Sequence, residues 1–209
     1  MLGFVFATEN EYKTFRLNVT DAQEKTLKMG QIIGCGKIQG RDLCYALSGC
    51  GKVNAAMVTE ALIEKYKPEA IVNIGLAGSV GLKPDTYYVY RCLQGDVDLK
   101  FLKSDTLDGS DTFQCSEKAM KLFPKMKTAN LITTDKFITE EAKDTEKRFG
   151  KCLVDMEGAA ICWVCFANDV DYFGIKIVSD TCDENEYKDS TVSLERSPAE
   201  IAIEFIKKF

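Results

Sequence analysis

Short apolar runs alternate along the chain with segments in which apolar residues recur at helical spacing. The runs have the length of buried strands, and they lie at 2–7, 70–75, 87–93, 131–134, 152–154 and 172–178. Apolar positions at 32–38 and 43–47 alternate around residues 40–42, which predicts a hairpin. Helical spacing predicts helices from Tyr12 onward, from Val53 to Lys67 before Pro68, and at 140–149, 159–166 and 198–208.

Strands that alternate with helices predict an α/β fold with helices on both faces of a sheet. The 209 residues are enough to bury one sizeable core, so we predict a single domain over residues 1–209. Between two predicted strands, the segment 98–128 is polar, charged and poorly periodic. Such a long irregular connection is typical of an excursion or lid.

Composition and charge narrow the classes of partner. Apolar residues make up 45% and charged residues 28%, as in globular proteins. The net charge of -5 disfavours nucleic acid and anionic membrane as partners, because both repel an acidic surface. No apolar run reaches the ~18 residues of a membrane span, and the N-terminal segment lacks the basic region of a signal peptide. We therefore expect a cytoplasmic protein.

Cysteine and histidine usage limits the chemistry. Nine cysteines are scattered without a repeating framework, which is typical of reduced, buried side chains. Cys162 and Cys165 form a C-x-x-C pair, but they lie inside a predicted helix and not at its start, which disfavours a redox motif. Since histidine is absent, a zinc site would need cysteines alone, and no second such pair exists. Acid–base chemistry must therefore use carboxylates, lysine, tyrosine or cysteine.

Glycine-containing turns follow two of the predicted strands. Gly49 and Gly51 permit a tight turn before a helix, but lysine follows at once, so neither the Walker spacing nor the dinucleotide-binding fingerprint is present. Gly75, Gly78 and Gly81 predict a loop at 76–81 whose backbone N–H groups can approach a ligand closely.

Carboxylates lie where three predicted strands end. Glu9 and Glu11 follow the first strand, Asp155 and Glu157 follow the run at 152–154, and Asp180 follows the run at 172–178. Each acid could instead cap a helix or lie in solvent, since helix N-termini favour carboxylates. Their joint placement at strand ends indicates one edge of a sheet, which is where open α/β sheets bind ligands.

Five segments carry a resemblance that spans nearly the whole chain: SGCGKVNAA (48–56), VNIGLAGSVG (72–81), LITTDKFI (131–138), VDMEGAAICWVC (154–165) and IVSDTCDE (177–184). In this order they resemble the purine nucleoside phosphorylase superfamily, and within it the 5'-methylthioadenosine/S-adenosylhomocysteine nucleosidases. The resemblance implies a three-layer α/β fold around a mixed, partly barrel-like sheet, and a homodimer. It also implies hydrolysis of the N-glycosidic bond of an adenine nucleoside that carries a thioether at the 5' position.

The resemblance also implies site residues. Asp180 matches the acid that protonates the departing purine, and Glu11 matches the carboxylate that activates water, with Glu9 a less favoured claimant. Glu157 matches a residue that accepts hydrogen bonds from the ribose hydroxyls, and Ser179 matches the residue that orients the acid. The implied substrate-binding positions at the base, the ribose and the 5' group are Met156, Glu157, Phe137, Ile138, Ser179, Ala77, Gly78 and Cys50.

These residue types suit the implied reaction on chemical grounds. Negative charge develops on the departing purine, and a neutral carboxylic acid can protonate it if burial raises the pKa of that acid. The attacking water needs an ionised carboxylate on the other side of the sugar. One further carboxylate can accept hydrogen bonds from two adjacent hydroxyls at once. This chemistry requires no metal and no organic cofactor.

The chain departs from the family pattern around the sugar. Leu76 stands where the family has a hydroxyl near the ribose, and Thr8 and Cys50 stand where larger apolar residues surround the 5' group. Tyr187 could supply an aromatic wall. These changes leave the identity of the 5' substituent open.

Two rival functions follow from the same residues. A phosphorylase of the superfamily would use phosphate as the nucleophile, but phosphate needs cationic or N–H donors. Here the sequence T-E-N-E follows the first strand, and Arg91 is the only arginine near a predicted strand end in that half of the chain. A nucleoside-binding protein without turnover would explain Leu76 and the altered 5' pocket, but it would have no need of Glu11 and Asp180 together.

Overall fold

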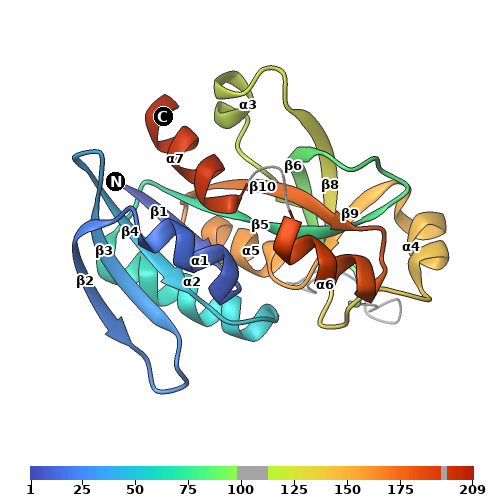
Figure 1. The fold of residues 1–209 in the computed structure, drawn as a ribbon, viewed down its shortest axis with the longest axis horizontal. Coiled ribbons are helices and arrows are strands. Elements are labelled where there is room, and N and C mark those ends of the chain that lie inside the picture. The colour runs from blue at the N-terminus through green and yellow to red at the C-terminus, as the bar shows by residue number, and fades with distance from the viewer. Residues whose placement is uncertain (98–112, 194–196) are drawn as a thin grey trace.

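The computed structural model describes residues 1–97, 113–193 and 197–209. Within these ranges the strands form one ten-stranded mixed sheet (Figure 1). The strands are β1 (Leu2–Phe6), β2 (Thr20–Thr26), β3 (Ile32–Ile38), β4 (Arg41–Leu47), β5 (Ala70–Val80), β6 (Thr86–Gln94), β7 (Phe113–Gln114), β8 (Lys127–Thr133), β9 (Cys152–Asp155) and β10 (Asp171–Asp180). The helices are α1 (Glu9–Arg16), α2 (Lys52–Tyr66), α3 (Lys118–Leu122), α4 (Ala142–Phe149), α5 (Gly158–Ala167), α6 (Glu184–Ser193) and α7 (Pro198–Lys208).

The sheet is open at one end and closed into a ring at the other. In its open part β1 lies between β4 and β5 in parallel, and β2, β3 and β4 extend it in antiparallel fashion. The long strand β5 pairs with both β9 and β10. Because β9, β8, β6 and β10 also pair in that order, these five strands form a ring. The predicted mixed, partly barrel-like sheet is confirmed.

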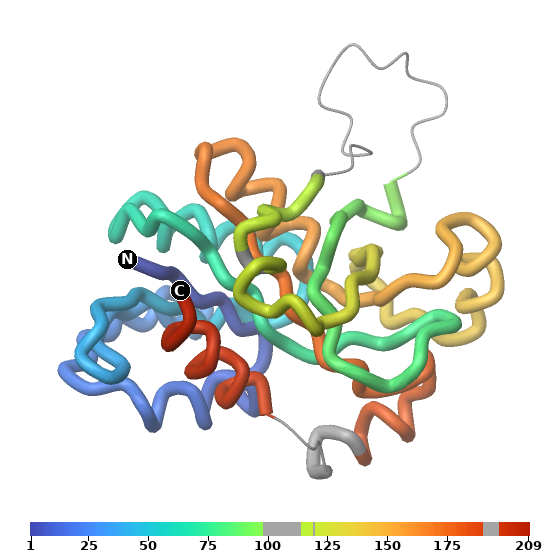
Figure 2. The backbone as a smooth tube through the Cα atoms, turned by 90° about the horizontal axis from the view of Figure 1, so that it is seen from above, coloured from blue at the N-terminus to red at the C-terminus, as the bar shows by residue number. Residues whose placement is uncertain are grey.

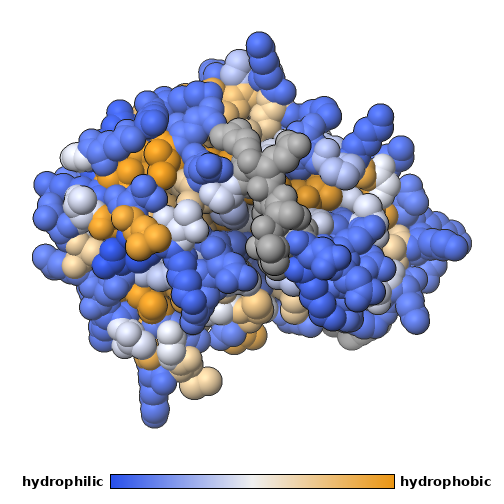
Figure 3. Space-filling model, viewed as in Figure 1, coloured by the Kyte–Doolittle hydropathy of each residue, from blue (hydrophilic) through white to orange (hydrophobic). Residues whose placement is uncertain are grey.

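Helices cover both faces of the sheet, as predicted. Helices α2 and α5 pack together on one side, and α1 and α7 pack together on the other (Figure 2). Helix α6 packs against β10, and on the face shown in Figure 3 the hydrophobic residues form separate patches among hydrophilic ones. Within the described part of the chain, no helix is both long and apolar enough to cross a membrane.

Capping explains where two of the helices begin. Helix α1 starts at Glu9, earlier than predicted, because the side chain of Thr8 accepts a hydrogen bond from the N–H of Glu11 and the Glu11 carboxylate accepts one from the N–H of Thr8. Ser197 and Glu200 form the same reciprocal pair at the start of α7. Strand β2 and helix α6 lack a clear apolar period, and the sequence did not predict them.

The structure corrects the predicted loop at 76–81. Strand β5 continues to Val80, because β9 and β10 both offer backbone partners to its second half. Two of its glycines make room for acids: a Cβ atom on Gly75 would lie 2.6 Å from Oε1 of Glu11, and one on Gly78 would lie 2.9 Å from Oδ1 of Asp180. Glycine therefore serves close packing within a strand here.

The predicted irregular segment at 98–128 is only partly described. Strand β7 and helix α3 lie within it, and β8 begins before its end. Residues 98–112, about half of the predicted excursion or lid, lie outside the described residues.

Candidate active site

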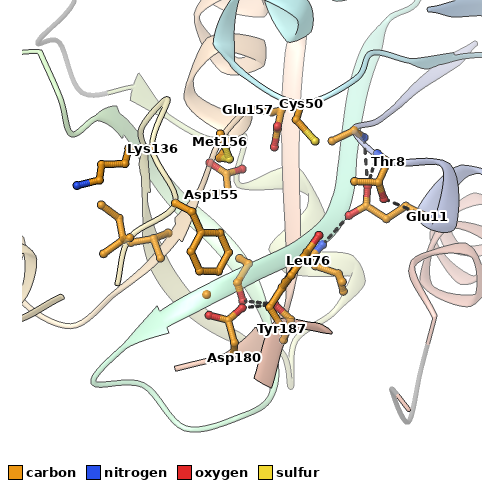
Figure 4. A pocket seen from close by; sticks show the side chains of 17 residues that line it. Thr8, Glu11, Cys50, Leu76, Lys136, Asp155, Met156, Glu157, Asp180 and Tyr187 are labelled. Atoms are coloured by element: carbon orange, nitrogen blue, oxygen red, sulfur yellow. Dashed lines mark hydrogen bonds between the residues drawn. The ribbon is translucent and has the colours of Figure 1, made fainter. Parts of the chain in front are cut away.

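One pocket collects the acids that the sequence places at strand ends. It is a cavity of about 250 Å³ at the ends of β1, β9 and β10 and beside residues 76–78 of β5, and Figure 4 shows Asp180, Glu11 and Glu157 on different sides of it. All ten residues predicted for the site line this pocket: Asp180, Glu11, Met156, Glu157, Phe137, Ile138, Ser179, Ala77, Gly78 and Cys50. The pocket is also lined by two residues that depart from the family pattern, Thr8 and Leu76, and by Tyr187, the expected aromatic wall.

Glu11 is held by backbone donors. Its carboxylate accepts hydrogen bonds from the N–H groups of Ala7 (3.1 Å), Thr8 (3.0 Å) and Leu76 (2.9 Å). These donors come from the end of β1 and from β5, so the two strands fix the carboxylate at the edge of the sheet. Glu9, the other claimant, pairs with Lys13 at the surface and does not line the pocket.

Asp180 lies at the end of β10, where the register with β5 shifts by one residue at Ser179. Such bulges change the direction in which a side chain points. The Ser179 hydroxyl donates to one oxygen of Asp180 at 2.7 Å, and the N–H of Cys182 donates to the other at 2.8 Å. Burial raises the pKa of Asp180 above its ordinary value, since a buried carboxylate is poorly solvated. A buried acid of this kind can hold a proton for transfer.

Glu157 is buried at the opposite side of the pocket. Its carboxylate accepts a hydrogen bond from the N–H of Gly51, at 2.8 Å, where α2 begins. Burial, with the nearby charge of Asp155, raises the pKa of Glu157 to about 7. Although Glu157 precedes α5, its side chain does not cap that helix. The helix-capping alternative therefore fails for Glu157.

Asp155 does serve as a cap, and it has a partner that the sequence reasoning missed. Its carboxylate accepts hydrogen bonds from the N–H of Gly158 (2.9 Å) and from the hydroxyl of Thr133 (2.5 Å). The Nζ atom of Lys176 lies 2.8 Å from the same carboxylate, and both side chains are about 3% exposed or less. Burial acts to lower the pKa of Lys176, but the charge and hydrogen bond of Asp155, together with the charges of Glu157 and Glu11, outweigh burial and the net shift is upward. A lysine inside the apolar run at 172–178 was the signal that could have revealed this pair.

A surface network fixes the loop that carries Phe137 and Ile138. The backbone N–H of Lys52 donates to Asp135 at 2.9 Å, and the Lys52 ammonium lies 2.6 Å from Asp96. Asp96 in turn accepts from the N–H of Asp135 at 2.9 Å. The loop after β8 is thus tied to the start of α2. On the pocket side, the ring of Phe137 packs edge-on against Tyr187, with ring centroids 5.6 Å apart.

The pocket is poor in cations. It is lined by Glu11, Asp155, Glu157 and Asp180, and the cationic residue among its lining residues is Lys136, which forms an ion pair with Glu141. Arg91, which the sequence placed near a strand end, lies over the Tyr90 ring and does not line the pocket. A phosphate dianion would meet several carboxylates in this cavity.

Comparisons of sequence agree with this picture. A family model described as "Phosphorylase superfamily" matches residues 2–207. A 5'-methylthioadenosine/S-adenosylhomocysteine nucleosidase of Haemophilus influenzae (strain PittGG) is 31% identical over 196 residues, which is 86% of this chain and 85% of the relative. One of Bacillus thuringiensis subsp. konkukian (strain 97-27) is 29% identical over 93% of this chain and 90% of its own length.

Solved structures share the fold. An MTA/SAH nucleosidase of Colwellia psychrerythraea 34H in complex with adenine has a TM-score of 0.89 at 24% identity, over 99% of this chain and 94% of its own. Futalosine hydrolase of Helicobacter pylori strain 26695 has a TM-score of 0.87 at 22% identity, over 100% of this chain and 97% of its own. These likenesses extend over the whole architecture, open sheet and closed ring together.

Proposed function

Because this chain belongs to the phosphorylase superfamily, we propose that it hydrolyses the N-glycosidic bond of 5'-methylthioadenosine, S-adenosylhomocysteine or a related adenine nucleoside. The chain is a nucleosidase, in line with relatives that match it over most of its length. The observation that carries the proposal is the pair of buried acids, Asp180 and Glu11, on different sides of one pocket. The products are adenine and the free thio-ribose.

In the proposed mechanism the two acids act in opposite protonation states. Asp180, whose pKa is raised by burial, donates a proton to the purine as the glycosidic bond breaks. Glu11 accepts a proton from the water that attacks the sugar, and its three backbone hydrogen bonds keep the carboxylate aimed at that position. Ser179 orients Asp180 through its hydroxyl.

The remaining lining residues hold the substrate. Glu157 accepts hydrogen bonds from the ribose hydroxyls beside Met156, and the backbone of Phe137 and Ile138 binds the purine. The backbone of Ala77 and Gly78 borders the sugar, and Cys50 borders the 5' substituent. No step of this mechanism uses a metal or an organic cofactor.

Hydrolysis is favoured over phosphorolysis by the charges of the pocket. Four acidic side chains line it, and its lysine is already paired with Glu141. Water carries no charge into such a site, whereas phosphate needs cationic or N–H donors.

Adenine release from a panel of nucleosides tests the proposal. The panel contains 5'-methylthioadenosine, S-adenosylhomocysteine, 5'-deoxyadenosine, adenosine and inosine, each with and without phosphate. We expect phosphate-independent release from the thioether nucleosides. Release only with phosphate would identify a phosphorylase, and tight binding without release at high enzyme concentration would identify a binding protein.

We also propose one domain over residues 1–209, a homodimer, and a cytoplasmic location. The match of the family model to residues 2–207 supports one domain. Exposed apolar residues on the adjacent helices α2 and α5, Val53, Met57 and Phe166, support a second copy as the partner that covers this face. Nine cysteines without a framework of pairs are typical of a reducing compartment.

A further inference from the structure

Three cysteine thiols from distant parts of the chain meet in the core. Cys92 lies in β6, Cys115 follows β7, and Cys162 lies in α5. Their sulfur atoms all lie within 4.8 Å of one another, and those of Cys92 and Cys115 are 3.7 Å apart. The three residues are 0%, 2% and 3% exposed, and none of them lines the pocket. The proposed hydrolysis makes no use of this cluster.

The separations match those of sulfurs that share one metal ion. Three sulfurs that surround an ion at about 2.3 Å each lie about 4.0 Å from one another in a plane. The sulfurs of Cys92 and Cys115, 3.7 Å apart, are close to this separation, and no two of the three sulfurs are more than 4.8 Å apart, so an ion could be bound with only small side-chain adjustments. Of the C-x-x-C pair, only Cys162 is a ligand. The fold brings the other two ligands, Cys92 from β6 and Cys115 from the segment after β7.

The ligand set selects the metal. Thiolates are soft ligands that favour Cu(I) and zinc over Mg²⁺ or Ca²⁺. Structural zinc almost always takes four ligands. Among the described residues, no cysteine or carboxylate is close enough to this group to be a fourth ligand. Cys165, one turn farther along α5, is buried but is not part of it. Three sulfur ligands suit Cu(I), a d10 cation that is stable with three ligands.

We propose that Cys92, Cys115 and Cys162 form a buried three-thiolate site that binds a thiophilic d10 cation, namely Cu(I). Binding forms three Cu–S bonds, displaces the thiol protons to solvent and changes no oxidation state. The ion links β6, the segment after β7 and α5, so its effect is on stability and not on the reaction. Without a cation, burial raises the pKa of Cys92 and keeps it a neutral thiol.

Competition for Cu(I) tests the site. The reduced full-length chain is titrated under nitrogen with Cu(I) held by a chromophoric bidentate chelator. We expect one copper per chain to leave the chelator and X-ray absorption to report three sulfur neighbours. In Cys162→Ala we expect affinity to fall by about 100-fold or more, since even changes outside the ligand set cost about 10–100-fold.

Matched controls separate the site from adventitious thiols. Cys44→Ala removes an equally buried cysteine on β4, and Cys35→Ala removes a partly exposed one on β3, and both should bind copper as the wild type does. Copper should raise the unfolding temperature of the wild type and of both controls, but not of Cys162→Ala. Equal copper uptake by Cys162→Ala, no uptake by the wild type, or loss of binding in Cys35→Ala would each overturn the proposal.

Discussion

The acids of the pocket are positioned by backbone donors and by missing side chains. Glu11 and Asp180 each accept from backbone N–H groups, and Gly75 and Gly78 leave the space that their carboxylates occupy. Backbone donors on two strands cost little reorganisation during a reaction, because the sheet already holds them in place. An amide of the same shape at either acid keeps an oxygen that can accept from these donors, so we expect such variants to fold.

Replacement of Asp180 by Asn should abolish turnover and leave the fold intact. The amide has the shape of the acid but cannot deliver a proton, so we expect kcat to fall by about 100-fold or more. For the wild type, activity should decline as pH rises through the raised pKa of Asp180, because the acid form is then lost. Steady-state adenine release across pH, with circular dichroism for the fold, measures both effects.

Asp183→Asn is the matched control for that experiment. Asp183 lies three residues on, at the start of α6, and asparagine can keep its bonds to the backbone N–H groups of Asn185 and Glu186. This control should keep wild-type activity. Wild-type rates from Asp180→Asn would rule out Asp180 as the proton donor.

Replacement of Glu157 by Gln should weaken substrate binding and stabilise the protein above neutral pH. Its pKa rises from 4.5 to about 7 on folding, so the folded state holds the proton more tightly than the unfolded state does. The resulting stability is fully present below pH 4.5 and is lost as pH rises to about 7, by on the order of 3 kcal/mol. Glutamine does not titrate, and its oxygen can still accept from Gly51.

Urea unfolding at several pH values checks this prediction. The free energy of unfolding of the wild type, relative to that of Glu157→Gln, should fall between pH 4.5 and 7 and then level off. A difference that does not vary with pH would mean that the charge of Glu157 is fully compensated in the folded state.

The start of α2 organises one wall of the pocket. The residue that begins the helix, Gly51, has no side chain that could cap it. Instead, the N–H of Gly51 donates to the Glu157 carboxylate, and the N–H of Lys52 donates to the Asp135 carboxylate. One helix end thus binds both the expected ribose acceptor and the loop that carries Phe137. This use of the unpaired N–H groups of a helix start connects three segments that are far apart in sequence.

Lys52→Met should loosen that loop without removing any group from the pocket. The methionine keeps the apolar stem and the backbone bond to Asp135, but it loses the ion pairs with Asp96 and Asp135. We expect KM for the nucleoside to rise by about 3- to 10-fold, because partly buried pairs contribute about 1 kcal/mol, while kcat changes less. Lys65→Met, an exposed lysine at the far end of α2, is the control. Equal changes in both variants would show that the network does not position the loop.

The whole sheet brings the site together. Strands β1, β5 and β10 run parallel, and the carboxyl ends of β1 and β10 lie beside the second half of β5. Strand β9 pairs with the same part of β5 and brings Asp155 and Glu157 to it. The face formed by α2 and α5 lies on one side of this sheet and carries exposed Val53, Met57 and Phe166. A second copy is the partner that we propose for it.

Charged residues on that face should dissociate the dimer. We expect Val53→Glu with Met57→Glu to shift the molar mass toward the monomer, because an interface core excludes unpaired charge. Leu17→Glu, at an 86% exposed apolar position beside α1, should leave the dimer intact. Light scattering after size exclusion measures the mass. A monomeric wild type, or equal dissociation by Leu17→Glu, would contradict the proposed interface.

Apolar patterning predicted most of the strands and helices correctly, including the hairpin and α7. It missed β2, which is polar and exposed, and α6, whose apolar residues follow no helical period. It also ended β5 too early, at Gly75. Glycine is typical of turns, and the sequence alone does not show that the glycines of this strand leave room for packed acids. The acids at strand ends were found because carboxylates interrupt apolar runs, whereas Lys176 was overlooked inside one.

The sequence by itself determined the fold class, the family and the acids available for chemistry, because these depend on local periodicity and on residue types in order. Only the tertiary structure decided that Asp155 caps a helix and pairs with a buried lysine while Glu157 does not cap, since the two acids have different distant partners, Lys176 and Gly51. It alone brought Cys92, Cys115 and Cys162 together. Contacts between residues far apart in the chain arise from strand pairing and helix packing, and local patterns do not encode them.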